Sequence, residues 1–247
     1  MKAAIISNCV TSDFQTNQSR ILELAAIAVK RGAELVLFPE AAATGLANIG
    51  YPTIDFNIAE QVPGPRNKGW KAFASENGVF FAAGLLEKEG ENIYDSALLF
   101  DPNGDLVLHY RRNDSGWHVS EDDPEVYREG SEIPIVATDF GRVAFLICGD
   151  LWNDEVMGKL KIRNPNMLLY PFARGLDATH DIESEWNKEL KSYIDRWKET
   201  GAVVLAANSF CESPNHSSVG GAWCIDAAGK IRASAPILKE SVLLVEV

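Results

Sequence analysis

Five consecutive apolar residues, Val143–Ile147, are the feature that most constrains the fold. An unbroken apolar run of this length is typical of a strand buried on both faces. The run ends at Cys148-Gly149-Asp150, where a strand would turn into the next element. Gly149 permits a tight or positive-φ turn there, and such a turn can push a side chain into a cleft at the sheet edge. Cys148 is therefore a candidate nucleophile, although a free cysteine is more often a small buried hydrophobe.

A second apolar strand, over 34–38, ends in a similar way. Pro39 stops it, and Glu40 follows directly. An isolated glutamate at such a place is most often a solvated loop residue. Open α/β sheets, however, build their sites at the carboxyl ends of strands. Two chemically capable residues at two such ends, Glu40 and Cys148, make a stronger case than either residue alone.

The rest of the chain continues this alternation of strands and helices. Apolar residues at helical spacing predict helices over 18–31, 66–77, 151–163 and 183–200. Short apolar runs predict strands over 2–8, 34–38, 79–84, 96–100, 105–110, 143–147, 167–170, 203–207, 220–226, 231–233 and 242–247. Loops are expected over 46–65 and over the polar stretch 113–130. Two strand-rich halves with helices between them predict two sheets, each covered by helices, in a single domain over 1–247.

Composition excludes several classes of partner. The chain has 247 residues, 46% of them hydrophobic, and a net charge of −12. An acidic chain disfavours nucleic acid and anionic membrane surfaces as partners. No cysteine spacing typical of zinc is present among Cys9, Cys148, Cys211 and Cys224. The N-terminal run has no signal-peptide pattern, and no apolar stretch is long enough to span a membrane, so we expect a cytoplasmic protein with reduced thiols.

Several blocks, taken in order, resemble the motifs of the nitrilase superfamily, the carbon–nitrogen hydrolases. They are Leu35–Glu40 followed by Thr44-Gly45, then Leu106–Arg112, Gly141–Asp150, Ala206–Asn208, and Gly220-Gly221 with Asp226 and Gly229. The ordered set covers nearly the whole chain. The resemblance implies a four-layer αββα sandwich of two mixed sheets. It also implies that the protein needs no metal and no organic cofactor.

The resemblance assigns chemistry to the strand ends. Cys148 would attack an amide or nitrile carbon, and Glu40 would act as general base. The family uses a lysine to stabilise the oxyanion, and that position aligns with Arg112, or with Arg111. Arginine is a permanently charged planar fork, so its reach differs from that of a lysine. Arg112 could bind the oxyanion, bind a substrate carboxylate instead, or simply be a surface charge.

A second acid is expected between the arginines and Cys148. The loop offers Glu121, Asp123 and Glu125, and we favour Glu125. Further candidates for the lining of the substrate site are Trp117, Asp150, Trp152, Phe172, Arg174 and Asn208. The aromatic residues among them are more often core, and Asp150 could instead brace the cysteine turn or cap the next helix. His118 is expected to be a loop histidine.

The leading prediction is a hydrolase of a small linear amide, an ω-amide or a carbamoyl compound, with water as co-substrate. A nitrile is the second candidate substrate. A ligand-binding homologue without catalysis is another possibility, because an arginine replaces the expected lysine. A cysteine–histidine hydrolase of another type is disfavoured by the block around Glu40. The resemblance also implies at least a homodimer.

Overall fold

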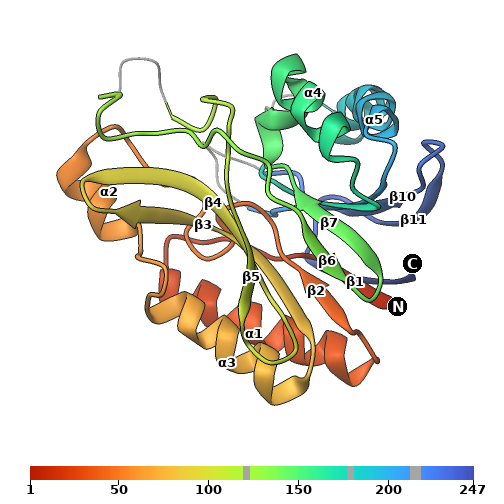
Figure 1. Cartoon of the computed structure of the whole chain (residues 1–247), viewed down its shortest axis with the longest axis horizontal. Coiled ribbons are helices and arrows are strands. Elements are labelled where there is room, and N and C mark those ends of the chain that lie inside the picture. Colours follow the sequence, from red (N-terminus) through yellow and green to blue (C-terminus); the bar gives the residue numbers. More distant parts are fainter. Residues whose placement is uncertain (119–122, 177–180, 212–217) are drawn as a thin grey trace.

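The computed structural model describes residues 1–118, 123–176, 181–211 and 218–247. Its centre is a pair of six-stranded sheets (Figure 1). The first sheet contains, in spatial order, β12 (Ser241–Glu246), β1 (Lys2–Ser7), β2 (Leu35–Leu37), β3 (Phe80–Glu89), β4 (Asn92–Phe100) and β5 (Leu106–Arg111). The second contains β11 (Ile231–Ala235), β10 (Ala222–Ile225), β9 (Val203–Asn208), β8 (Met167–Phe172), β7 (Gly141–Phe145) and β6 (Val136–Thr138).

Both sheets are mixed and have the same plan. Strands β1, β2 and β3 are parallel at the centre of the first sheet, and β7, β8 and β9 are parallel in the second. Antiparallel strands flank each parallel core. The carboxyl ends of β2 and β7 therefore each lie inside a parallel core, which is where α/β sheets place functional groups.

Helices cover the outer face of each sheet, as expected for an αββα sandwich. They are α1 (Phe14–Lys30), α2 (Pro52–Ile58), α3 (Pro65–Asn77), α4 (Asp154–Arg163) and α5 (Ile182–Glu199), with a 3₁₀ helix over Cys148–Trp152. Figure 1 shows α1 and α3 side by side below the first sheet, and α4 and α5 beside the second. Asp13 caps α1 by accepting hydrogen bonds from the backbone N–H groups of Gln15 and Thr16. Within the described part of the chain, no helix is both long and apolar enough to cross a membrane.

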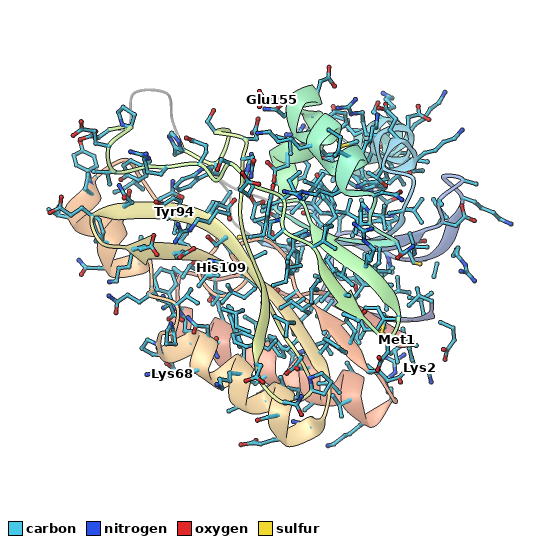
Figure 2. All side chains as sticks on the ribbon, in the orientation of Figure 1. Met1, Lys2, Lys68, Tyr94, His109 and Glu155 are labelled. Carbon is cyan, nitrogen blue, oxygen red and sulfur yellow. The ribbon has the colours of Figure 1, made fainter. Side chains whose placement is uncertain are left out.

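The apolar core has two main layers. One contains inward-facing side chains of both sheets, among them Leu37, Leu99 and Phe145, and continues beneath α4 and α5. The other lies between the first sheet and its helices and is built around Trp70 and Phe81, whose rings stack. In Figure 2 side chains fill the spaces between these layers. The sheets are thus fixed against each other, which holds the ends of β2 and β7 in a constant relation.

The structure departs from the predicted elements at several places. Helix α1 begins four residues before the expected start, because Asp13 provides the cap. The expected loop over 46–65 contains α2, a short helix that Pro52 begins at a favourable first position. Strands β3 and β4 form a longer hairpin than their apolar runs predicted, since both continue through polar residues at Glu87 and Asp95. The short edge strand β6 has no clear apolar run and was not expected.

Candidate active site

Glu40 lies in a turn that β3 holds from both sides. The Gly84 N–H donates to the carbonyl of Pro39, and the Ala42 N–H donates to the carbonyl of Gly84, both at 3.0 Å. A Cβ atom at Gly84 would lie 2.6 Å from the Ala41 nitrogen, so only glycine lets the two backbones approach this closely. Glu40 is fully buried as a result. A carboxylate with no access to water needs a partner within the protein.

Cys148 stands at the corresponding turn after β7. Its own φ is 43°, whereas Gly149 does not have a positive φ, so the strained residue is the cysteine itself. Such left-handed non-glycine residues cluster at functional sites. The Tyr170 hydroxyl, on β8, donates to the Cys148 carbonyl at 2.6 Å. Of the tight or positive-φ turn expected at Gly149, only the tight turn is present, within the 3₁₀ helix over Cys148–Trp152. The reason for this glycine is space rather than conformation.

That space is occupied by the guanidinium of Arg112. A Cβ atom on residue 149 would lie 2.2 Å from Arg112 Nη2 and 2.3 Å from Asp114 Oδ1. Arg112 is 3% exposed, and its backbone is fixed by hydrogen bonds with Asp95 and Gly130. Its side chain thus reaches the cysteine turn from the end of β5.

Three carboxylates hold this guanidinium. Arg112 Nη1 lies 2.9 Å from Glu40 Oε1 and 3.5 Å from Asp95 Oδ2, while Nη2 lies 3.0 Å from Asp114 Oδ1. The Nε–H of Arg112 is buried and has no hydrogen-bond partner among the described residues. The site therefore holds one fixed cation with a spare donor.

Burial and charge decide the protonation of these groups. Burial and the Glu40 carboxylate raise the pKa of the Cys148 thiol well above its usual value, although Arg112 opposes them. Burial alone would lower the pKa of Arg112, but Glu40, Cys148 and Asp95 raise it well above its usual range. The resting cysteine is thus a neutral thiol beside a permanent cation. Any attack by sulfur requires a base close to it.

Asp150 joins the cysteine turn to the segment that carries Arg112. One carboxylate oxygen accepts the N–H groups of Asn113 and Asp114 at 2.9 Å each. The other accepts the Ile147 N–H at 2.9 Å and the Tyr110 hydroxyl at 2.7 Å. Burial raises the pKa of Asp150 to about 6 despite these donors. The four contacts occupy both carboxylate oxygens of Asp150 and connect the cysteine turn to the segment after β5. These are the contacts expected of a residue that braces the turn.

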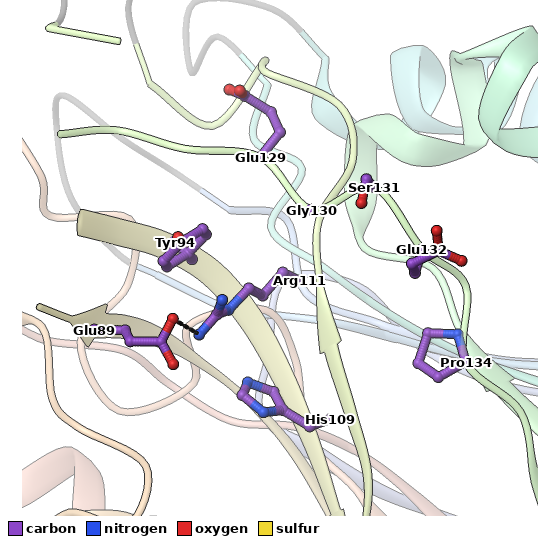
Figure 3. A pocket seen from close by; sticks show the side chains of 9 residues that line it. All are labelled: Glu89, Tyr94, His109, Arg111, Glu129, Gly130, Ser131, Glu132 and Pro134. Carbon is purple, nitrogen blue, oxygen red and sulfur yellow. Dashed lines mark ion pairs between the residues drawn. The ribbon is translucent and has the colours of Figure 1, made fainter. Parts of the chain in front are cut away.

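Arg111 has a different set of partners from Arg112. With Ser96 and His109 it surrounds the buried carboxylate of Glu87, and its guanidinium lies 3.8 Å from the centre of the Tyr94 ring. Arg111, His109 and Tyr94 line part of a surface hollow of about 430 Å³, shown in Figure 3, where Arg111 also pairs with Glu89. The hollow lies apart from Cys148, so Arg112 rather than Arg111 is the arginine beside the thiol.

The structure leaves the predicted second acid outside this cluster. Glu125 is exposed, and the Asp123 side chain accepts a hydrogen bond from the Glu125 N–H at 2.9 Å. Glu121 lies outside the described residues. The acids that contact Arg112 besides Glu40 are instead Asp95 and Asp114.

The predicted lining residues have different surroundings. Phe172 is buried among the rings of Tyr170, Trp186, Tyr193, Trp197 and Trp223, and is core. Trp117 is buried in a small apolar cluster that also contains Ala41. Trp152 is exposed, edge-on to Tyr193.

The last two predicted lining residues lie together beyond β8 and β9. Arg174 is exposed, and its guanidinium is paired with Glu189 at 2.6 Å. The buried amide of Asn208 accepts the Arg174 N–H at 2.8 Å and donates to the carbonyls of Arg174 and Gly220. These bonds give Asn208 the contacts of a residue that fixes the loop after β8.

Asp95 is the residue that the sequence pattern missed. The predicted strand began at Ser96, which left Asp95 outside it. The available signal was a carboxylate directly before an apolar run, because an acid inside a buried strand is rare unless it is paired. Asp114 was visible only as one of many acids in a polar loop.

Comparison with known proteins identifies the family. The family model for carbon-nitrogen hydrolases matches residues 2–247. The chain belongs to the carbon-nitrogen hydrolase family. Nitrilase 3 from Arabidopsis thaliana is 27% identical over 85% of this hydrolase family member, and the aligned part is 62% of that protein. The chain thus spans less than two thirds of the curated nitrilase. A citrullinase from Francisella tularensis is 21% identical over 87% of this chain and 76% of its own length.

Solved structures agree on the fold of this family member. An amidase from Nesterenkonia sp. AN1 superposes with a TM-score of 0.83 at 22% identity, covering 100% of this chain and 92% of its own. The predicted nitrilase-like αββα sandwich is confirmed by that likeness and by the two mixed sheets. Among the described residues, no group of three or more side chains is arranged to hold a metal ion.

Proposed function

We propose that this chain hydrolyses the C–N bond of a small amide through a thioester on Cys148. The observation that carries the proposal is the single buried cluster of Glu40, Arg112 and the Cys148 thiol, which come from three distant segments. An acid, a fixed cation and a thiol are the groups that cysteine-based acyl transfer requires. The amidase from Nesterenkonia sp. AN1, which has the same fold, has been solved with butyramide and with acrylamide added at its active site cysteine.

The groups divide the reaction into two halves. In the first, Glu40 takes the proton of the Cys148 thiol while sulfur bonds to the amide carbon and the carbonyl electrons move onto oxygen. The N–H groups of Arg112 stabilise that oxyanion. Its collapse breaks the C–N bond, and Glu40 returns the proton to the departing amine. A thioester on Cys148 remains.

Water completes the second half. Glu40 removes a proton from water as its oxygen bonds to the thioester carbon. The tetrahedral intermediate again places its charge at Arg112, and the C–S bond then breaks. The proton on Glu40 passes to the departing sulfur. The enzyme returns to a neutral thiol, which agrees with the raised pKa of Cys148.

A nitrile is the second candidate substrate. The curated relatives include nitrilases at 27% to 28% identity. The same cluster could add sulfur to a nitrile carbon, which gives a thioimidate instead of a tetrahedral oxyanion. A cation as large as Arg112 is better matched to an oxyanion than to a nitrile nitrogen, so we place the amide first.

A non-catalytic binding role is the alternative from another class. It follows from the arginine at the position where the family resemblance expects a lysine. Under this alternative Arg112 would bind a substrate carboxylate and no thioester would form. The unpartnered Nε–H of Arg112 serves either role, so only chemistry separates them.

The test is incubation with a panel of linear amides, ω-amides, carbamoyl compounds and nitriles, followed by intact-mass spectrometry. We expect an acyl adduct and turnover in the wild type, and neither in Cys148→Ala. Cys224→Ala removes another buried thiol and should keep both, which makes it the matched control. Normal turnover by Cys148→Ala would disprove the mechanism. Ligand binding with no adduct and no turnover would favour the binding protein.

Arg112→Lys and Arg112→Ala test the cation. We expect Arg112→Ala to lose about 10²-fold or more of kcat, the usual loss on removal of an oxyanion donor. Equal kinetics in wild type, Arg112→Lys and Arg112→Ala would mean that another group stabilises the oxyanion.

A homodimer and a cytoplasmic location also stay proposals, and light scattering on the purified chain would measure the oligomeric state.

A further inference from the structure

Two buried carboxyl groups lie together at the base of the site. Asp95, 1% exposed, and Glu40, fully buried, both contact Arg112 Nη1, at 3.5 and 2.9 Å. Both carboxyl groups thus approach the same guanidinium nitrogen. Two ionised carboxylates have only acceptor oxygens, so they repel each other at this separation unless a proton lies between them.

The unpartnered oxygens support the same conclusion. Asp95 Oδ1 and Glu40 Oε2 are both buried, and neither has a donor among the described residues. Buried polar atoms in folded proteins are almost always hydrogen-bonded. A single proton shared between the two carboxyl groups would satisfy both of them. No other described side chain supplies that donor.

The charge balance identifies which carboxyl group holds the proton. The charged and titratable groups facing Asp95 are Glu40, Arg112, Asp150 and the Cys148 thiol. Arg112 lies closer to Glu40 than to Asp95, so the cation compensates a charge on Asp95 less well. Burial and the neighbouring Glu40 raise the pKa of Asp95 well above its usual value. Like carboxylates this close rarely ionise together.

We propose that Asp95 is a positioning residue that holds a proton shared with Glu40 and so keeps Glu40 ionised and aimed at the Cys148 thiol. The inference rests on the proposed function for its catalytic meaning. When Glu40 takes the thiol proton, Asp95 keeps its own proton and its hydrogen bond to the Glu40 carboxyl group. Asp95 thus makes no contact with substrate and passes no proton to it.

Infrared difference spectroscopy tests the proton without any substrate. At pH 7 the wild type should show the carbonyl stretch of a protonated carboxylic acid, and Asp95→Asn should lose it. Asp55→Asn is the matched control, because Asp55 is a buried carboxylate that accepts the N–H groups of Ile49 and Gly50 and the Tyr127 hydroxyl. That variant should keep the band. If Asp95→Asn removes no acid band, the inference is overturned.

Kinetics test the positioning role. Asn at position 95 is a neutral donor of the same shape as a protonated aspartic acid, so kcat should stay within about threefold, with one ionisation lost from the alkaline limb of the pH profile. Asp95→Ala has no donor, and its kcat should fall by about 10²-fold with KM nearly unchanged. An Asp95→Asn variant as impaired as Asp95→Ala, although folded, would overturn the inference. If no amide or nitrile is turned over, the proposed function fails while the infrared result still decides the shared proton.

Discussion

Replacing Gly149 with alanine perturbs the site by one methyl group. The new Cβ atom would lie 2.2 Å from Arg112 Nη2, whereas ordinary contact begins near 3.4 Å, so the guanidinium must retreat by about 1 Å. A long side chain in solvent would do this easily, but Arg112 is 3% exposed and is held by three carboxylates. A misplacement of about 1 Å at a catalytic group can cost about 10²-fold in rate. We therefore expect Gly149→Ala to lose about 10²-fold in kcat.

The assay compares amide turnover and thermal unfolding of Gly149→Ala with those of Gly158→Ala. Gly158 lies in α4, and a Cβ atom there would meet nothing within 4 Å, so its variant should keep full activity and gain up to about 1 kcal/mol of stability. Gly149 has no positive φ, so a lower kcat in Gly149→Ala does not result from backbone strain. The reasoning is refuted if folded Gly149→Ala keeps kcat within about threefold while Arg112→Ala loses its activity.

Three further predictions concern groups around the site. Hydrogen bonds from a histidine and an arginine lower the pKa of Glu87 from 4.5 to about 2 despite its burial. The stabilisation of the fold by the ionised Glu87 is therefore complete above pH 4.5 and disappears as the pH falls towards 2. Glu87→Gln should thus cost about 3 kcal/mol in urea unfolding at pH 7, with little difference from wild type near pH 2, whereas exposed Glu89→Gln should cost almost nothing. Asn208→Ala should lower the free energy of unfolding by about 2 to 3 kcal/mol, because buried partners lose their hydrogen bonds. Arg174→Ala should change kcat less than about threefold, since its exposed guanidinium is paired with a helix residue, and a large loss would place it in the site.

The sequence predicted the strands that lead into the site better than the hairpin beside it. Apolar runs located the carboxyl ends of β2 and β7, and hence Glu40 and Cys148, because a buried parallel strand admits few polar residues. The same rule made the predicted β3 and β4 too short, because β3 contains Glu87 and β4 contains Asp95. A charged residue inside a strand can be predicted only when its partner is known. The partner of Glu87 is Arg111 on β5, and the partner of Asp95 is Arg112 just beyond β5.

The second acid could not be predicted for the same reason. Counting residues along the loop pointed nearest to Asp123, and Glu125 was favoured because it is a glutamate; the structure leaves Glu125 exposed. Asp95 precedes Arg112 by seventeen positions, and the antiparallel pairing of β4 with β5 brings them together. That register depends on a hairpin and an irregularity near Leu99, which sequence spacing does not reveal.

The guanidinium of Arg112 explains why these neighbours occur together. A guanidinium presents a broad fork that needs several acceptors at fixed angles, whereas an ammonium is a compact point charge. Here Glu40 and Asp95 hold one arm, Asp114 holds the other, and Gly149 leaves room for it. Removing a single partner would leave a buried charge unbalanced, which is more costly than replacing the whole set. Arg112→Lys keeps the charge but loses the fork, so we expect it to be less active than wild type and more active than Arg112→Ala in the amide assay.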